Sequence, residues 1–186
     1  YTQINNNQIY KPEQILVVGI SQSGTSVSTV EAMRKAKSEG YLTVALTEAL
    51  NSLITREVDV VVPLTCGKEE IPIETRGYII TLLTGYLWAV EIAGALGRLN
   101  SIQLQQKLDD AQTMLAHFDE LTAEVQLWID RNQPELLNME RGHIAAYGTH
   151  YPTALEGVLK MYETFHKPLS AYELEELIQA PRSEER

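Results

Sequence analysis

Apolar runs alternate with helix-period segments over the first hundred residues of the chain. Three runs rich in β-branched residues predict buried strands, at residues 14–20, 41–46 and 58–63. Residues 27–38 carry apolar side chains at helical spacing, with Val30, Met33 and Ala36 facing inward, and Gly40 follows as the expected C-terminal cap. Because the strands are continuous apolar runs that alternate with helices, the pattern predicts an α/β fold with a parallel sheet covered on both faces.

Two further helices are predicted in this first part, a short turn at residues 52–56 and a long apolar helix at 73–96. Within the second, residues 78–97 are long enough to span a bilayer. The segment contains Thr81, Thr84 and Glu91 and no basic cluster brackets it, so we expect a buried helix of the core or of a subunit interface, and no membrane.

The pattern changes after residue 100. Apolar side chains recur every three or four positions over residues 101–130 and predict a helical connector packed on a core, which Pro134 ends. A strand-like run at 142–148 is followed by a helix with Pro152 in its first turn, where its missing N–H costs nothing. The strand–loop–helix unit therefore recurs, and we interpret it as the opening of a second α/β module.

Composition narrows the classes of partner. The formal net charge of −10 argues against nucleic acid and anionic membranes, which both require a basic surface. Cys66 is the only cysteine, so no internal disulfide can form; with a polar N-terminus unlike a signal peptide, this predicts a reducing cytoplasm. The four histidines and Cys66 show no metal-ligand spacing, so we expect no metal and no cofactor.

The loop that ends the first predicted strand carries the strongest functional signal, the sequence Ser-Gln-Ser-Gly-Thr-Ser at residues 21–26. Short hydroxyls and a glycine at a strand-to-helix junction leave N–H and O–H groups available to an anion, and a helix N-terminus adds partial positive charge. A sugar phosphate could be held in this way. The alternative is that the serines only cap the helix, since Ser28 and Glu31 have capping-box spacing.

These residues resemble a known family. SQSGTS after an apolar strand, then GYLTVALT and CGKEEIPIET, resembles the first sugar isomerase (SIS) domain of two-domain phosphosugar isomerases, which include the isomerase module of glucosamine-6-phosphate synthase and the fructosamine-6-phosphate deglycases. The run from 145 to 177, with its Ala-Leu-Glu-Gly, resembles the start of their second SIS domain. The resemblance extends from about Gln14 onward.

The resemblance implies a Rossmann-like parallel sheet flanked by helices, incomplete at its start. Residues 1–98 would form a first SIS domain lacking its first strand–helix unit, 99–140 a helical connector, and 141–186 the beginning of a second SIS domain. We therefore expect a fragment of a longer protein. Since relatives pair their SIS domains, and the missing unit leaves a surface to cover, a homodimer or higher homo-oligomer is expected.

The resemblance also implies substrate-binding residues in the first domain. Ser21, Gln22, Ser23 and Ser26 correspond to positions that hydrogen-bond the phosphate and hydroxyls of a sugar phosphate. Glu69 and Thr75 lie in the loop after the third strand, where relatives hold sugar hydroxyls with the Glu69 position and the backbone near Pro72. Glu70 and Glu74 make this loop acidic, and its charges could equally be solvated loop residues.

Catalytic roles are implied for Glu156, Lys160 and Glu163, which share one face of the predicted helix. On residue pattern alone, Glu followed by Lys four positions later is a common surface ion pair. In relatives, the Glu163 position moves a proton between C1 and C2, the Lys160 position stabilises the oxygen of the enediol or enolamine, and the Glu156 position organises the site.

One position departs from the family. Relatives carry His-Gly-Pro where this chain has Gln179-Ala-Pro, and that histidine is thought to open the sugar ring; glutamine does not titrate, and His166 is not at the matching position. Three hypotheses therefore stay open. They are an aldose–ketose isomerase or deglycase/deaminase acting on a hexose 6-phosphate or its amine adduct, a phosphosugar-binding module without turnover, and a scaffold without a ligand.

Overall fold

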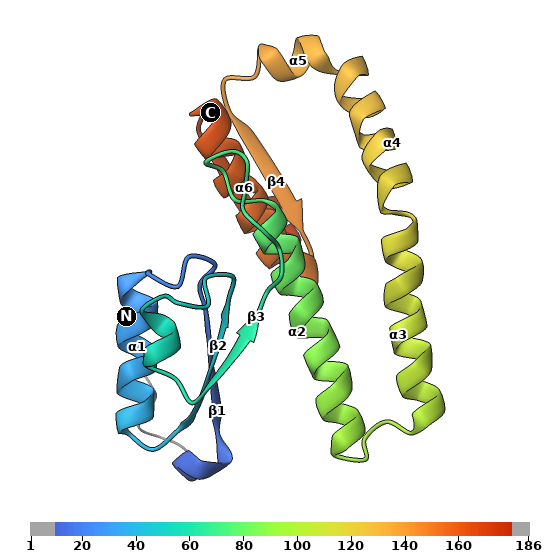
Figure 1. The fold of residues 1–186 in the computed structure, drawn as a ribbon. Helices are drawn as coiled ribbons and strands as arrows, with labels where there is room; N and C mark the ends of the chain where they lie inside the picture. The colour runs from blue at the N-terminus through green and yellow to red at the C-terminus, as the bar shows by residue number, and fades with distance from the viewer. Residues whose placement is uncertain (1–9, 180–186) are drawn as a thin grey trace. The chain divides into compact units, whose positions relative to one another are not determined.

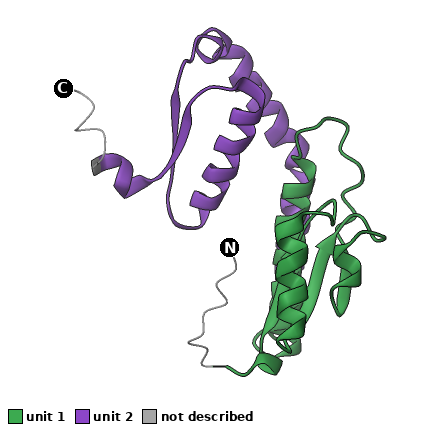
Figure 2. Cartoon of the chain, turned by 90° about the vertical axis from the view of Figure 1, so that its left-hand side faces the viewer, with its two compact units in different colours: residues 1–104 green, residues 105–186 purple. Residues whose placement is uncertain are grey.

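The structure, a computed structural model, describes residues 10–179 of the 186-residue chain. It divides into two compact units, residues 1–104 and 105–186 (Figure 2). The two units are defined by their compactness alone, so they do not test the predicted SIS domains and connector. The assignment of 1–98, 99–140 and 141–186 to these parts stays a prediction.

Unit 1 is built on a three-stranded parallel sheet of order β1-β2-β3 (Figure 1). The strands are β1 (Leu16–Ile20), β2 (Leu42–Thr47) and β3 (Val60–Pro63). All three predicted strands are confirmed, as is their parallel arrangement. β1 begins two residues later than predicted, because the 3-10 turn η1 (Pro12–Gln14) occupies the start of the predicted run.

Helix α1 (Val27–Ser38) covers one face of this sheet. Its buried side chains are Val30, Met33 and Ala36, which confirms the predicted inward face. The core on this side joins Val30 and Met33 to Ala45 of β2 and to Ile54 of the 3-10 turn η2 (Ile54–Arg56). Two glycines permit this packing and the chain reversal after it. A Cβ on Gly19 would lie 2.6 Å from the Met33 sulfur, and Gly40, with φ +85°, reverses the chain as predicted.

Helix α2 (Arg76–Ala95) contributes Ile80 and Trp88 to the core on the other face, around Leu46, Leu64 and Cys66. Only Gly77 and Val90 are buried among its residues, so the first predicted alternative, a helix buried in the core, does not hold within this chain. The second alternative, a helix of a subunit interface, stays a prediction. A 20-residue helix is about 30 Å long, and a sheet of three short strands contacts only part of it. By length and composition alone, α2 could cross a membrane.

Helix α2 exposes several large apolar side chains besides its charged residues Arg76 and Glu91. The large apolar side chains open to solvent are Ile79, Leu82, Tyr86, Ile92 and Leu96. They follow one another at helical spacing and form a continuous apolar stripe, which we call the α2 stripe.

The predicted connector is two helices, α3 (Ser101–Ala116) and α4 (Phe118–Arg131), with a break at His117. Among the described residues of these helices only Ala111 is buried, so the expected packing on a core is wrong within this chain. Helix α4 ends at Arg131, so the predicted break near Pro134 is confirmed. Pro134 itself lies in the first turn of the next helix, α5 (Gln133–Leu137), where its missing N–H has no partner to lose.

Unit 2 contains a strand–helix–strand arrangement that is followed by a short helix. β4 (Gly142–Ala146) and β5 (Leu169–Glu173) pair in parallel, with Ile144 opposite Ala171. The turn η3 (Gly148–His150) and α6 (Tyr151–Phe165) connect them, α6 packs on both strands, and α7 (Leu174–Gln179) follows. The predicted recurrence of a strand–loop–helix unit is confirmed, and β5 is an element that the apolar pattern did not indicate.

Candidate functional site

Three loops of unit 1 leave the carboxyl ends of its strands, and they contain all the predicted binding residues of this unit. In a parallel sheet these ends share one edge, which is where ligands bind in open α/β folds. The carbonyl of Gln22, after β1, accepts hydrogen bonds from Thr47 Oγ1 at 3.2 Å and from the backbone N–H of Glu48 at 3.2 Å. The first two loops are therefore tied together at their bases.

The loop from Ser21 to Ser26 is held by its own hydroxyls. Ser21 is buried; its Oγ accepts the Gly24 N–H at 3.1 Å and donates to Ser26 Oγ at 3.1 Å. Gly24 has φ +63°, and a Cβ there would overlap Ser52 Oγ, so only glycine fits. Ser23 Oγ lies 3.0 Å from Thr25 Oγ1 on the exposed side.

The first turn of α1 keeps its backbone N–H groups free. The helix begins at Val27 and its N-cap, Ser26, makes no side-chain cap, so the predicted capping box at Ser28 and Glu31 is wrong because Ser28 already lies inside the helix. Across residues 10–179, no acceptor receives the N–H groups of Val27, Ser28 or Thr29. Such groups, at the positive end of a helix, are suited to an anion.

The β3–α2 loop meets this first loop at the start of α2. Glu69 Oε1 accepts the backbone N–H of Gly77 at 2.9 Å, and this hydrogen bond lowers the pKa of Glu69. The side-chain amide of Gln22 occupies the space in front of Gly77 where a Cβ would stand. Thr75 is the N-cap of α2 and is exposed, without a side-chain cap bond. Gln22 and Glu69 are thus neighbours, although 47 positions separate them in the sequence.

The three predicted catalytic residues lie together on α6 in unit 2. Lys160 Nζ is 3.1 Å from Glu163 Oε2 and 3.4 Å from Glu156 Oε1. Partial burial of Lys160 favours its neutral form, but the hydrogen bond to Glu163 and the charge of Glu156 outweigh that effect, so the pKa of Lys160 is raised. The ammonium is therefore fixed between two carboxylates. This geometry fits both the catalytic interpretation and the surface ion pair.

Sequence reasoning missed a second set of contacts in unit 1. Glu48 Oε2 accepts the backbone N–H of Cys66 at 2.9 Å, and Arg76 Nη1 donates to the Cys66 carbonyl at 3.3 Å. Glu48 directly follows β2, so the rule that ligands and polar contacts gather at the carboxyl ends of parallel strands could have indicated it.

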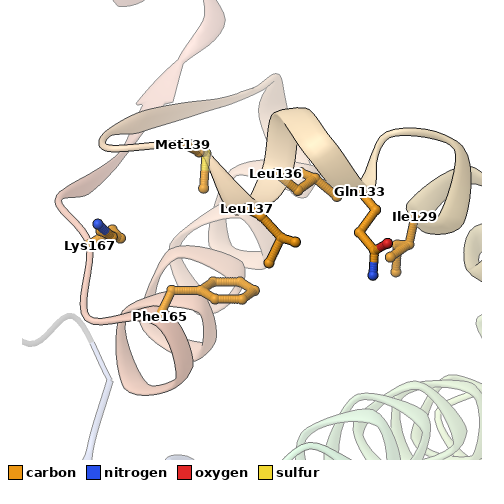
Figure 3. A pocket seen from close by; sticks show the side chains of 7 residues that line it. All are labelled: Ile129, Gln133, Leu136, Leu137, Met139, Phe165 and Lys167. Atoms are coloured by element: carbon orange, nitrogen blue, oxygen red, sulfur yellow. The ribbon is translucent and has the colours of Figure 1, made fainter.

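Unit 2 also contains an open groove of about 220 Å³ (Figure 3). In Figure 3 the side chain of Leu137 points toward the ring of Phe165, and Lys167 lies at the rim. Ile129, Gln133, Leu136 and Met139 complete the lining. None of these is a predicted site residue. Within residues 10–179 no group of three His, Cys, Asp or Glu side chains is placed to hold a metal ion.

Comparison with known sequences finds isomerizing glutamine–fructose-6-phosphate aminotransferases among the relatives of this chain. The chain is 29% identical over 171 residues to the glutamine–fructose-6-phosphate aminotransferase (isomerizing) of Caldanaerobacter subterraneus, covering 89% of the chain and 27% of the enzyme. It is 31% identical over 179 residues to that of Clostridium tetani, covering 94% of the chain and 28% of the enzyme. The chain thus spans about a quarter of these relatives. No family model matches it.

Solved structures share this fold. A candidate phosphosugar isomerase from Clostridium difficile 630 aligns with a TM-score of 0.90 and 30% identity, over 94% of this chain and 50% of that one. The C-terminal domain of glucosamine–fructose-6-phosphate aminotransferase from Francisella tularensis aligns with a TM-score of 0.85 and 25% identity, over 96% and 50%. The predicted resemblance to the isomerase module of these enzymes and to phosphosugar isomerases is therefore confirmed. The chain spans about half of the two solved structures, and its α/β fold is the one predicted.

Proposed function

We propose that this chain is the phosphosugar-binding part of a sugar-phosphate isomerase, or of a deglycase or deaminase, that acts on a hexose 6-phosphate or its amine derivative. The observation that carries the proposal is the first turn of α1, where the N–H groups of Val27, Ser28 and Thr29 have no acceptor within residues 10–179. The homology to fructose-6-phosphate aminotransferases supports the substrate class.

In this proposal the phosphate lies against the first turn of α1. The N–H groups and the helix dipole stabilise its charge locally, despite the net charge of −10. The hydroxyls of Ser23 and Ser26 donate to phosphate oxygens, and Ser21 holds the loop shape through its bonds to Gly24 and Ser26. Gln22, Glu69 and Thr75 bind sugar hydroxyls at the start of α2.

The proton transfer is assigned to the cluster on α6. Glu163, as a carboxylate, removes the proton from the carbon next to the sugar carbonyl and returns it to the neighbouring carbon after the enediol forms. Lys160 stabilises the negative charge that develops on the oxygen, and Glu156 keeps Lys160 in place, 3.4 Å away. The carboxylates of Glu163 and Glu156 raise the pKa of Lys160, which favours its ammonium form.

Two measurements on the chain test this proposal. Calorimetry should show binding of fructose 6-phosphate, and NMR should show its conversion to an isomer, or amine release from the amine derivative. Glu163→Gln should abolish turnover and leave phosphosugar affinity within about threefold, because the substitution removes the base and keeps the shape. Full turnover in Glu163→Gln would contradict the assigned mechanism.

A phosphosugar-binding module without turnover is the second candidate. Gln179 supports it, because glutamine does not titrate and so cannot act as the acid or base that opens the sugar ring; its side chain lies outside the described part of the structure. Binding of fructose 6-phosphate without any product detected by NMR would favour this candidate over the enzyme.

The assembly and location of the chain are also proposals. The α2 stripe exposes large apolar side chains along one side of a helix, which is unusual for a monomer and supports a homodimer or higher homo-oligomer. A single cysteine and a metabolic substrate are consistent with a cytoplasmic protein. Cell fractionation of the natural protein tests the location, and recovery outside the cytoplasm would contradict it.

A further inference from the structure

The β3–α2 loop bends sharply just before Glu69. Thr65 has φ +57° and Gly67 has φ +71°, so the chain passes twice through the left-handed region within three residues. Glycine adopts this conformation freely, but a β-branched residue such as threonine does so only when its surroundings impose it. The contacts of the residue between them, Cys66, show what imposes it.

Side chains from two neighbouring segments hold both backbone groups of Cys66. Glu48, after β2, accepts the Cys66 N–H at 2.9 Å and the Cys66 thiol at 3.5 Å. Arg76, at the start of α2, donates to the carbonyl of Cys66 at 3.3 Å and to that of Lys68 at 3.5 Å. Cys66 is only 5% exposed, so without Glu48 its N–H would be buried without a partner.

We infer that Glu48 and Arg76 are positioning residues that hold the β3–α2 loop in this bent conformation and thereby place Glu69 at the phosphosugar site. Glu69 follows Cys66 by three positions, and its carboxylate reaches the Gly77 N–H beside Gln22 only if the bend is kept. The role assigned to Glu69 rests on the proposed function, whereas the holding of the loop does not.

The single cysteine makes the loop directly observable. Cys66 is the only thiol in the chain, so its alkylation by iodoacetamide, followed by mass spectrometry of the folded protein, reports opening of this loop alone. We expect Glu48→Ala to be alkylated about tenfold faster than the unmodified protein, and Glu13→Ala, on an exposed residue of η1, to be unchanged.

A second variant separates loop opening from thiol chemistry. Burial and Glu48 raise the pKa of the Cys66 thiol, so removing the charge alone could speed alkylation. Glu48→Gln removes the charge but keeps an oxygen that accepts the Cys66 N–H. We expect its alkylation rate to stay within about threefold of the unmodified protein. An equal rise in both variants, or no rise in Glu48→Ala, would overturn the inference.

Binding of fructose 6-phosphate, measured by calorimetry, tests the effect on the site. We expect about tenfold weaker binding in Glu48→Ala and near-normal binding in Glu48→Gln. If the unmodified protein binds and Glu48→Ala binds equally well, the positioning role is overturned. If the unmodified protein does not bind, the proposed function fails, while the alkylation rates still decide whether Glu48 holds the loop. If Glu48→Ala does not fold, Arg76→Ala replaces it, because Arg76 is exposed. We then expect the same faster alkylation of Cys66 and the same weaker binding of fructose 6-phosphate in Arg76→Ala.

Discussion

Single side chains decide the shape of the loops around the sheet. Ser21 and Gly24 fix the first loop, and Glu48 and Glu69 fix the third, each through a hydrogen bond to a backbone N–H. The importance of the first loop could be predicted, because hydroxyl side chains clustered between a strand and a helix offer hydrogen-bond donors to an anion. The role of Glu48 was not, since it depends on a residue 18 positions away that only the folded sheet brings near.

At the opposite edge of the sheet, Asp59 gives a prediction about acid stability. Its carboxylate accepts hydrogen bonds from the Thr43 hydroxyl and N–H, at 2.7 and 3.0 Å, and Lys37 Nζ lies 3.0 Å away. These partners lower its pKa from 3.8 to about 2, with the Thr43 hydroxyl contributing most. Because the folded pKa is the lower one, the stabilisation is complete above about pH 4 and is lost as the pH falls toward 2.

Melting temperatures measured between pH 2 and 7 test whether the Asp59 carboxylate stabilises the fold. We expect Asp59→Asn to melt below the unmodified protein at neutral pH, with a difference that shrinks as the pH falls from about 4 to 2. A difference that stays constant over this range would show that the carboxylate charge does not stabilise the fold.

At the scale of elements, the sequence predicted the helices and strands whose positions depend on the local pattern of apolar and polar residues. The parallel strands, α1 with its buried face, and the strand–loop–helix unit near residue 145 follow from periodicity and turn residues. The two expectations of burial that differ from the structure, for the long apolar helix and for the connector, share one cause, which is that burial depends on the surfaces an element packs against. The apolar composition of α2, α3 and α4 indicated burial, yet within this chain most of their side chains stay exposed. β5 was missed because Leu169–Glu173 has no β-branched residue.

The packing of α1 on β1 gives a prediction for a pair of variants. Met33→Ala removes a side chain that is 1% exposed and should lower the free energy of unfolding by about 2–5 kcal/mol. Gly19→Ala places a methyl 2.6 Å from the Met33 sulfur and should cost about 1–3 kcal/mol through overpacking.

In the double variant, the added methyl occupies part of the space left by the methionine. Denaturant unfolding should therefore show a combined loss smaller than the sum of the single losses by at least about 0.5 kcal/mol. Strict additivity would mean that Gly19 and Met33 do not share this space.

At the scale of the molecule, the two units divide the proposed work. Unit 1 carries the loop proposed to bind the phosphate and the residues proposed to hold the sugar, and unit 2 carries the cluster of Glu156, Lys160 and Glu163. The α2 stripe needs a partner surface to be buried. We expect a second copy to supply it, through the α2 stripe.

Sedimentation of matched variants tests this expectation. Leu82 and Leu53 are both 53% exposed, but only Leu82 belongs to the α2 stripe. Leu82→Glu should dissociate the oligomer, because a charge buried at an apolar interface is costly, and Leu53→Glu should leave it intact. A chain that sediments as a monomer at every concentration, or equal behaviour of both variants, would contradict a stripe-mediated assembly.

The most direct measurement follows the backbone amide signals of ¹⁵N-labelled protein during titration with fructose 6-phosphate and, separately, with fructose. If the first turn of α1 binds the phosphate, the signals of Val27, Ser28 and Thr29 shift with the phosphorylated sugar and stay in place with fructose. The account is contradicted if those three signals do not move with fructose 6-phosphate, or if they move equally with the sugar that lacks the phosphate.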